Sequence, residues 1–254
     1  MQVNKITIIK GLGLFIVGIY CLSFAHKKIN AQEITEIAID IKQNERNPLL
    51  EPEDIHQILI EKYSEPVIGQ KVTDFDFIGL DSVLTQSAFV KSANAFSNVQ
   101  GKLFLRIESE QPILRIINSS GAQYYLTKEG RKMPLSSHQS ARVIIANGRI
   151  TEEFSNTDSL STTVLKNLYK VAQQLEEQPF FKALTGQLSV ASNGDIILIT
   201  KAEERHDINL GNAEDLPSKF DRLRQFYTKV LSIKGWGAYT TLNLKYKNQI
   251  IAKK

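Results

Sequence analysis

The first apolar stretch of the chain lies at its N-terminus, where residues 11–25 carry no charge and follow Ile6-Thr7-Ile8-Ile9 and a single Lys10. A helix over residues 6–25 would be about 30 Å long, which matches the hydrocarbon thickness of a bilayer. The pattern therefore predicts a membrane anchor within residues 1–28. A cleavable signal peptide is the alternative, but Lys27 and Lys28 directly after the run and the lack of a small-residue cleavage motif favour retention.

Polar and apolar residues then alternate, as in a half-buried strand, and are followed by two amphipathic stripes with helical spacing. Pro52 suits the first turn of the first helix, where Glu53 and Asp54 lie at the positive end of the helix dipole. The predicted elements are a strand at 33–41, helices at 52–63 and 80–88, and strands at 89–96 and 102–108. This β-α-α-β-β order predicts a small α+β domain over residues 29–111.

The remaining residues, 112–254, alternate short apolar runs with glycine-containing turns. Predicted strands are 113–117, 123–126, 142–146, 186–191, 195–200 and 206–210, with helices after Asp158 and from Pro217, and a terminal hairpin of 240–246 and 249–253. The Ser192-Asn193-Gly194 turn is the strongest hairpin signal. The fold class expected is α+β: an N-terminal membrane helix, the small domain, and then a mainly antiparallel β-domain with two helices.

The net charge of +4 does not indicate a nucleic-acid-binding protein. Residues 1–28 hold four lysines and no acidic residue, so the other 27 basic residues are balanced by 27 acidic ones. A neutral remainder has no broad positive surface for a phosphate backbone. Two lysines lie on each side of the apolar run, so charge leaves the membrane orientation open.

The sequence carries no recognisable catalytic or cofactor motif, such as G-x-S-x-G, S-x-x-K, H-E-x-x-H or a phosphate-binding glycine loop. A single cysteine, Cys21, excludes an internal disulfide and a thiolate–metal cluster. Asp74 and Asp76 form a D-x-D pair, which we interpret as a turn entering a helix rather than a metal site. The charged triplet at 203–205 is interpreted as a solvated turn. We expect no enzyme activity, cofactor, metal or small-molecule substrate.

Two segments resemble the FtsQ/DivIB family of bacterial cell-division proteins. Residues 111–137 are similar to the start of that family's β-domain, with Tyr124-Tyr125-Leu126, Gly130 and Met133-Pro134-Leu135. Residues 208–254 resemble its closing helix and strands, through Leu210-Gly211, Lys219, Leu223, Leu244-Lys245-Tyr246 and Gln249-Ile250-Ile251. The unit at 29–111 occupies the place of the family's POTRA domain, although glycines typical of that domain are few here.

The resemblance implies a single-pass type II protein of the bacterial inner membrane, with its ectodomain in the periplasm and enrichment at the division septum. It implies binding to coiled-coil division proteins of the FtsB/FtsL type, and a part in controlling septal peptidoglycan synthesis. In this family the last strands form a sheet edge to which the partner adds a strand.

The sequence of the terminal hairpin suits such strand addition, because its closing strand carries little charge to protect an open edge. The partner-binding residues expected are Trp236, Leu242, Leu244, Tyr246, Gln249, Ile250 and Ile251. The alternative is that this strand only completes the core sheet. Trp236 suits the core and a partner surface equally, whereas Phe180 and Phe181 are expected in the core.

Two other functions remain open at this point. A POTRA-bearing transport or outer-membrane assembly factor would be expected to carry several such domains or a barrel, whereas this chain has one unit and few strands. A membrane-tethered cell-wall enzyme would need the catalytic groups that the sequence lacks.

Overall fold

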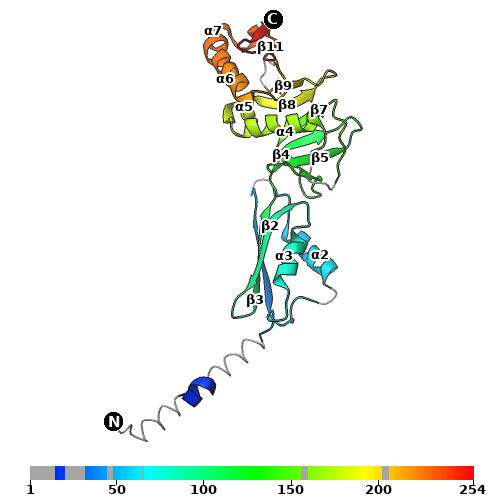
Figure 1. The fold of residues 1–254 in the computed structure, drawn as a ribbon, viewed down its shortest axis with the longest axis vertical. Helices are drawn as coiled ribbons and strands as arrows, with labels where there is room; N and C mark the ends of the chain where they lie inside the picture. Colours follow the sequence, from blue (N-terminus) through cyan, green and yellow to red (C-terminus); the bar gives the residue numbers. More distant parts are fainter. Residues whose placement is uncertain (1–14, 21–31, 45–47, 64–65, 156–159, 202–205) are drawn as a thin grey trace, which may run out of the picture. The chain divides into compact units, whose positions relative to one another are not determined.

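The computed structural model describes residues 15–20, 32–44, 48–63, 66–155, 160–201 and 206–254 (Figure 1). Residues 15–20 are helical, and the rest of the predicted anchor at 6–25 lies outside the described residues. Within the described parts, no helix has the length and apolar character needed to cross a bilayer. The chain packs as two units: residues up to 42 with 50–109, and residues 43–49 with 110–254.

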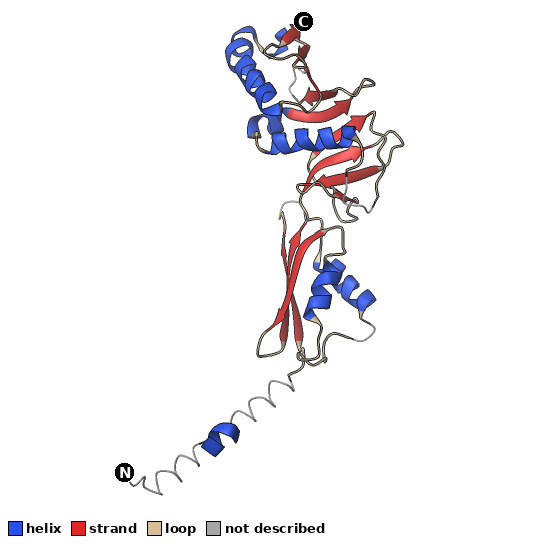
Figure 2. Cartoon of the chain, viewed as in Figure 1, coloured by secondary structure: helices blue, strands red, loops and turns tan. Residues whose placement is uncertain are grey.

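The first unit is a three-stranded sheet with two helices on one face (Figures 1 and 2). Its elements are β1 (Glu36–Lys42), α2 (Pro52–Lys62), α3 (Phe77–Leu84), β2 (Val90–Ser97) and β3 (Lys102–Ser109). Strand β3 is central: it pairs in parallel with β1 and antiparallel with β2. The predicted β-α-α-β-β order is therefore confirmed. Inward-facing Leu103, Leu105 and Ile107 are at most 2% exposed and form the centre of its core.

Local sequence explains where the helices of this unit begin and end. Pro52 occupies the first turn of α2, and Asp54 accepts a hydrogen bond from the N–H of Glu51 (2.8 Å) in a capping box. Asp76 caps α3 by accepting from the N–H of Gly79 (2.8 Å). Helix α3 ends at Leu84, earlier than the predicted Ala88. The next residue, Thr85, bonds its hydroxyl to the Asp81 carbonyl (2.9 Å).

Within the described residues, the second unit forms one sheet of nine strands in the order β12-β11-β10-β9-β8-β7-β4-β5-β6. Its strands are β4 (Pro112–Ile117), β5 (Gln123–Thr127), β6 (Lys132–Met133), β7 (Ile144–Gly148), β8 (Thr185–Val190), β9 (Ile196–Thr200), β10 (Asp207–Gly211), β11 (Thr241–Asn243) and β12 (Ile251–Lys253). The sheet is mixed rather than mainly antiparallel, because β4–β7, β7–β8 and β10–β11 pair in parallel. Sequence analysis did not anticipate β6.

The helices of this unit explain two of the parallel pairs. Helix α4 (Thr163–Glu176) lies in the connection from β7 to β8, and α6 (Leu216–Phe226) lies in the connection from β10 to β11. A crossover through a helix brings the next strand back in the same direction. Helix α6 continues through a π-helical turn, η1 (Tyr227–Leu231), into α7 (Ser232–Lys234).

Two helix predictions need correction. The N-cap of α4 is Thr162, whose hydroxyl accepts from the N–H of Leu165 (3.2 Å), whereas the expected cap Asp158 lies outside the described residues. A third helix, α5 (Pro179–Leu184), exceeds the predicted two. Phe180 and Phe181, both expected in the core, lie in this helix. Phe181 is fully buried, whereas Phe180 is 51% exposed, so only Phe181 belongs to the core.

A buried ion pair fixes the chain that leads into α4. The Lys132 ammonium lies 2.7 Å from the Glu152 carboxylate, and both residues are 7% exposed. The same carboxylate accepts hydrogen bonds from the N–H groups of Ser161 (2.9 Å) and Thr162 (2.7 Å). These contacts fix the start of the helix that covers the sheet.

Candidate functional site

The terminal hairpin lies at one end of the large sheet. Strand β12 pairs antiparallel with β11, with Leu242 opposite Ala252 and Asn243 opposite Ile251. The N–H of Thr240 extends the pairing by donating to the Lys253 carbonyl (2.8 Å). The outer side of β12 faces no other strand of the described residues, because β12 ends the strand order. The hairpin is shorter than predicted, and residues 244–250 form its loop.

The two faces of the hairpin have different surroundings. Leu242 and Leu244 are fully buried, and Ile250 and Ala252 pack against the same core. Ile251, which is 41% exposed, points to the opposite face because successive side chains alternate along a strand. Leu242 and Leu244 therefore anchor the hairpin, and Ile251 is the apolar side chain that this strand offers to solvent.

The hairpin loop is held from helix α6 by Arg222. Its Nη1 donates to the carbonyls of Tyr246 (2.6 Å) and Gln249 (3.1 Å), on either side of the turn. Asn248, between them, has a φ of 59° and so adopts the left-handed conformation that asparagine tolerates in turns. Tyr246 and Gln249 are themselves exposed. Their backbones are thus fixed while their side chains stay accessible.

A second contact joins the hairpin to the β8–β9 turn. Lys245 Nζ lies 2.8 Å from Asp195 Oδ2, which also accepts from the side-chain amides of Asn193 (2.9 Å) and Asn209 (3.3 Å). Burial alone would raise the pKa of Asp195, but these hydrogen bonds outweigh it and lower the pKa. The hydrogen bond to Asp195 correspondingly raises the pKa of Lys245. The ion pair is therefore formed at neutral pH.

Gly211 and Lys219 support the neighbouring strand β10. Gly211 has a φ of 66°, and a Cβ there would lie 2.8 Å from Lys245 Cγ, so glycine leaves room for the Lys245 stem. Lys219, which is 5% exposed, donates from Nζ to the carbonyls of Leu210 (2.8 Å) and Asn212 (2.9 Å). Burial lowers the pKa of Lys219. These contacts tie α6 to the end of β10, directly beside β11.

Trp236 lies in a 3-10 turn, η2 (Trp236–Ala238), ahead of β11. Its ring packs edge-on against Tyr227 with centroids 5.2 Å apart, and 37% of the residue is exposed. The fold thus places Leu242 and Leu244 in the core with Ile250 packed against it, whereas Trp236 packs on the π-helical turn. Sequence reasoning missed Arg222 and Asp195, since neither an arginine on a helix nor an aspartate in a turn signals a tertiary contact by its sequence alone.

Of the two weaker signals in the sequence, the structure describes one. The D-x-D pair is the turn before α3: Asp74 bonds to the Thr73 hydroxyl (3.0 Å) and Asp76 is the helix cap, as interpreted. The charged triplet at 203–205 lies outside the described residues. Among the residues that the structure describes, no group of three His, Cys, Asp or Glu side chains is placed to hold a metal ion.

Comparison with known families matches both units. Residues 111–253, more than half of the chain, match the family described as FtsQ/DivIB, C-terminal related. Residues 32–108 match the POTRA-like domain. No curated protein matches the chain at a significant level. The mixed sheet with its terminal hairpin is thus the family's C-terminal domain behind a POTRA-like domain, and the chain belongs to the FtsQ/DivIB family of cell-division proteins.

Proposed function

We propose that this chain is a scaffold of the bacterial divisome that binds a coiled-coil division protein of the FtsB/FtsL type by strand addition to β12. In this proposal, residues 6–25 anchor it in the inner membrane and both units lie in the periplasm at the septum. There it helps to control septal peptidoglycan synthesis. FtsQ/DivIB proteins are a non-enzymatic, divisome-associated family, which supports the general role.

The observation that carries the proposal is the position of β12 at the end of the sheet order. An edge strand presents backbone N–H and C=O groups that a further strand can use. Natural edges that serve no partner are usually shielded by charge, proline or a covering loop. In β12, Lys253 provides charge at the end of the strand, but Ile251 places an exposed apolar side chain beside it.

The free energy of backbone hydrogen bonds alone is not sufficient for binding a partner at this edge. A strand of this length offers two or three hydrogen bonds, each with a net contribution of about 1 kcal/mol. A micromolar complex requires about 8 kcal/mol. Side chains must supply the remainder, and the exposed apolar surface of Ile251, Tyr246 (51% exposed) and Trp236 is available for this. Of the seven residues expected from sequence, these three are the proposed contacts. Leu242, Leu244 and Ile250 act through the fold, and Gln249 is an exposed loop residue whose carbonyl accepts from Arg222.

The test measures capture of the FtsB/FtsL-type proteins of the same organism by the purified full chain. Truncation after Tyr246 should abolish capture because β12 is removed, and Ile251→Pro should do so because it removes the N–H that pairs β12 with Asn243 of β11. Ile251→Glu should weaken binding at least tenfold without touching the core. Val99→Glu, at a 91% exposed position in the first unit, is the matched control and should bind as the natural chain does.

Equal capture by the Ile251→Glu and Val99→Glu chains would contradict the proposed edge. At the cellular level, depletion of the protein should produce filaments because septation fails. Intact division with outer-membrane defects would instead favour a transport or assembly role.

A further inference from the structure

The POTRA-like unit also has an open strand edge, on β1. Strand β1 pairs with β3 along its whole length, from Glu36–Lys102 to Lys42–Glu108, and ends the order of its sheet. Just before β1, the N–H of Ile34 donates to the carbonyl of Gln70 (2.8 Å), on the side away from β3. The N–H of the next residue, Thr35, donates to the carbonyl of Gly101 (3.0 Å), on the β3 side. Bonding direction alternates along a strand. The backbone groups of Ala38 and its alternate neighbours therefore point away from β3, toward no strand of the described residues.

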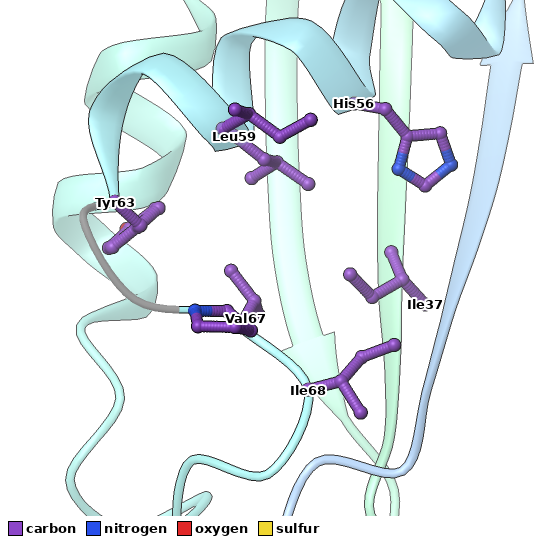
Figure 3. A pocket seen from close by; sticks show the side chains of 8 residues that line it. Ile37, His56, Leu59, Tyr63, Val67 and Ile68 are labelled. Atoms are coloured by element: carbon purple, nitrogen blue, oxygen red, sulfur yellow. The ribbon is translucent and has the colours of Figure 1, made fainter.

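An apolar pocket lies beside this edge, on the helix side of the sheet (Figure 3). Its volume is about 420 Å³, which accommodates one or two large side chains. The pocket is lined by Ile37 of β1, by His56, Leu59, Ile60 and Tyr63 of α2 and the residue that follows it, and by Pro66, Val67 and Ile68. Leu59 and Val67 are buried, while Ile60 (74% exposed) and Ile68 (55% exposed) lie open to solvent.

The edge and the pocket together select an extended ligand. In a strand added along β1, side chains on the helix face would point toward the pocket, as Ile37 does, and the next ones would point to the opposite face. On that opposite face β1 carries Glu36 and Asp40, both exposed; Glu36 already pairs with Lys102 Nζ of β3 (2.7 Å), so Asp40 is the carboxylate that a basic side chain of the added strand would meet. Oppositely charged side chains stabilise directly facing positions of neighbouring strands.

We propose that the POTRA-like unit binds an extended segment of a partner protein that alternates bulky apolar and basic residues. The segment adds a strand to β1, places an apolar side chain in the pocket, and sets a basic side chain beside Asp40. This site is separate from the β12 edge and does not depend on the function proposed for that edge. It gives the chain a second, independent docking site.

Charged residues on an edge strand can instead serve only to prevent aggregation. That explanation accounts for Glu36 and Asp40 but not for the pocket, because a protective edge would place charge at its mouth. Ile60 and Ile68 are found there instead. Exposed isoleucines around a concave apolar site are typical of a binding surface.

The test uses the purified full chain and fluorescent synthetic peptides of about nine residues, the length of a long strand. One set alternates lysine with leucine, valine or phenylalanine, and the matched set carries glutamate in place of lysine. Fluorescence anisotropy should show saturable binding of the lysine set, with the glutamate set at least tenfold weaker. Binding should protect the N–H of Ala38 from hydrogen exchange.

Two variants and one control separate this site from non-specific binding. Ile60→Asp should weaken the lysine peptides at least tenfold by placing a charge at the pocket, and Ala38→Pro should do so by removing an outward donor. Ile78→Asp alters an isoleucine that is 84% exposed on α3, outside the pocket, and should bind like the natural chain. Absence of saturable binding, or equal affinity of the Ile60→Asp and Ile78→Asp chains, would overturn the proposal and leave β1 as a merely protected edge.

Discussion

At the scale of single residues, Glu152 combines deep burial with a full set of hydrogen-bond donors. Burial would raise the pKa of its carboxyl group, but the hydrogen bonds from Lys132, Ser161 and Thr162 outweigh this and hold the pKa at about 2. The ordinary value is 4.5. Because the folded-state pKa is depressed, the stabilisation is fully present above about pH 4.5 and is lost as the pH falls toward about 2.

We predict that Glu152→Gln lowers the free energy of unfolding of the second unit by about 3 kcal/mol at neutral pH, because Lys132 is left buried without its counter-charge. Urea unfolding followed by Trp236 fluorescence reports on this unit alone, since the chain has one tryptophan. The difference between the two chains should shrink as the pH is lowered from about 5 to about 2.5. A difference that stays constant over this range would show that the carboxylate charge is not the cause.

Residue-level prediction from sequence succeeded for local contacts and failed for distant ones. The cap of α3 by Asp76 follows from neighbouring residues. The partners of Glu152 are spread along the chain, and no local pattern joins them. Alternation predicts Leu242, Leu244 and Tyr246 on one face of a strand: Leu242 and Leu244 are buried together, but Tyr246 is 51% exposed in the loop, because the strand ends at Asn243. Alternation also could not decide which face is the core, because Ile251 makes the other face apolar as well.

At the scale of elements, the sheet is mixed and not mainly antiparallel as expected, because helices connect some of its consecutive strands. Helices were predicted between 142–146 and 186–191, and between 206–210 and 240–246. A strand, a helix and a strand in succession form a crossover, so those strands could have been predicted to run in parallel. The order of neighbouring strands could not have been predicted from the sequence, because β4 and β7 pair although no turn connects them directly.

The link between α6 and the hairpin loop gives the second prediction. Arg222→Ala should speed hydrogen exchange at residues 246–252 several-fold, because the loop loses its two hydrogen bonds from Nη1. The change in overall stability should stay near 1 kcal/mol, since the core residues are unchanged.

Arg224→Ala is the control for this element. Arg224 lies two positions further along the same helix and bonds to Gln178 instead of to the hairpin. Its replacement should leave exchange at 246–252 unaltered. If both variants, or neither, accelerate exchange there, Arg222 does not hold the loop.

At the scale of the whole molecule, the two units have hydrophobic cores that share no residue. We predict that calorimetry resolves two unfolding transitions. Leu105→Ala should lower the midpoint temperature of one transition by several degrees and leave unchanged the midpoint of thermal unfolding followed by Trp236 fluorescence. Leu198→Ala should instead lower the midpoint reported by Trp236. Both leucines are fully buried, and each truncation should cost about 3 kcal/mol. A single transition shifted by both variants would show that the units unfold together.

The pairing of β12 also determines how the molecule would respond to mechanical load. A partner strand pulled away from the edge applies its force to a ladder of three residue pairs, which peels open one pair at a time. Behind that ladder, the bonds from Arg222 and the Lys245–Asp195 ion pair resist further unravelling. If β12 binds a partner as proposed, the hairpin would therefore yield under load before the other strands of the sheet are strained.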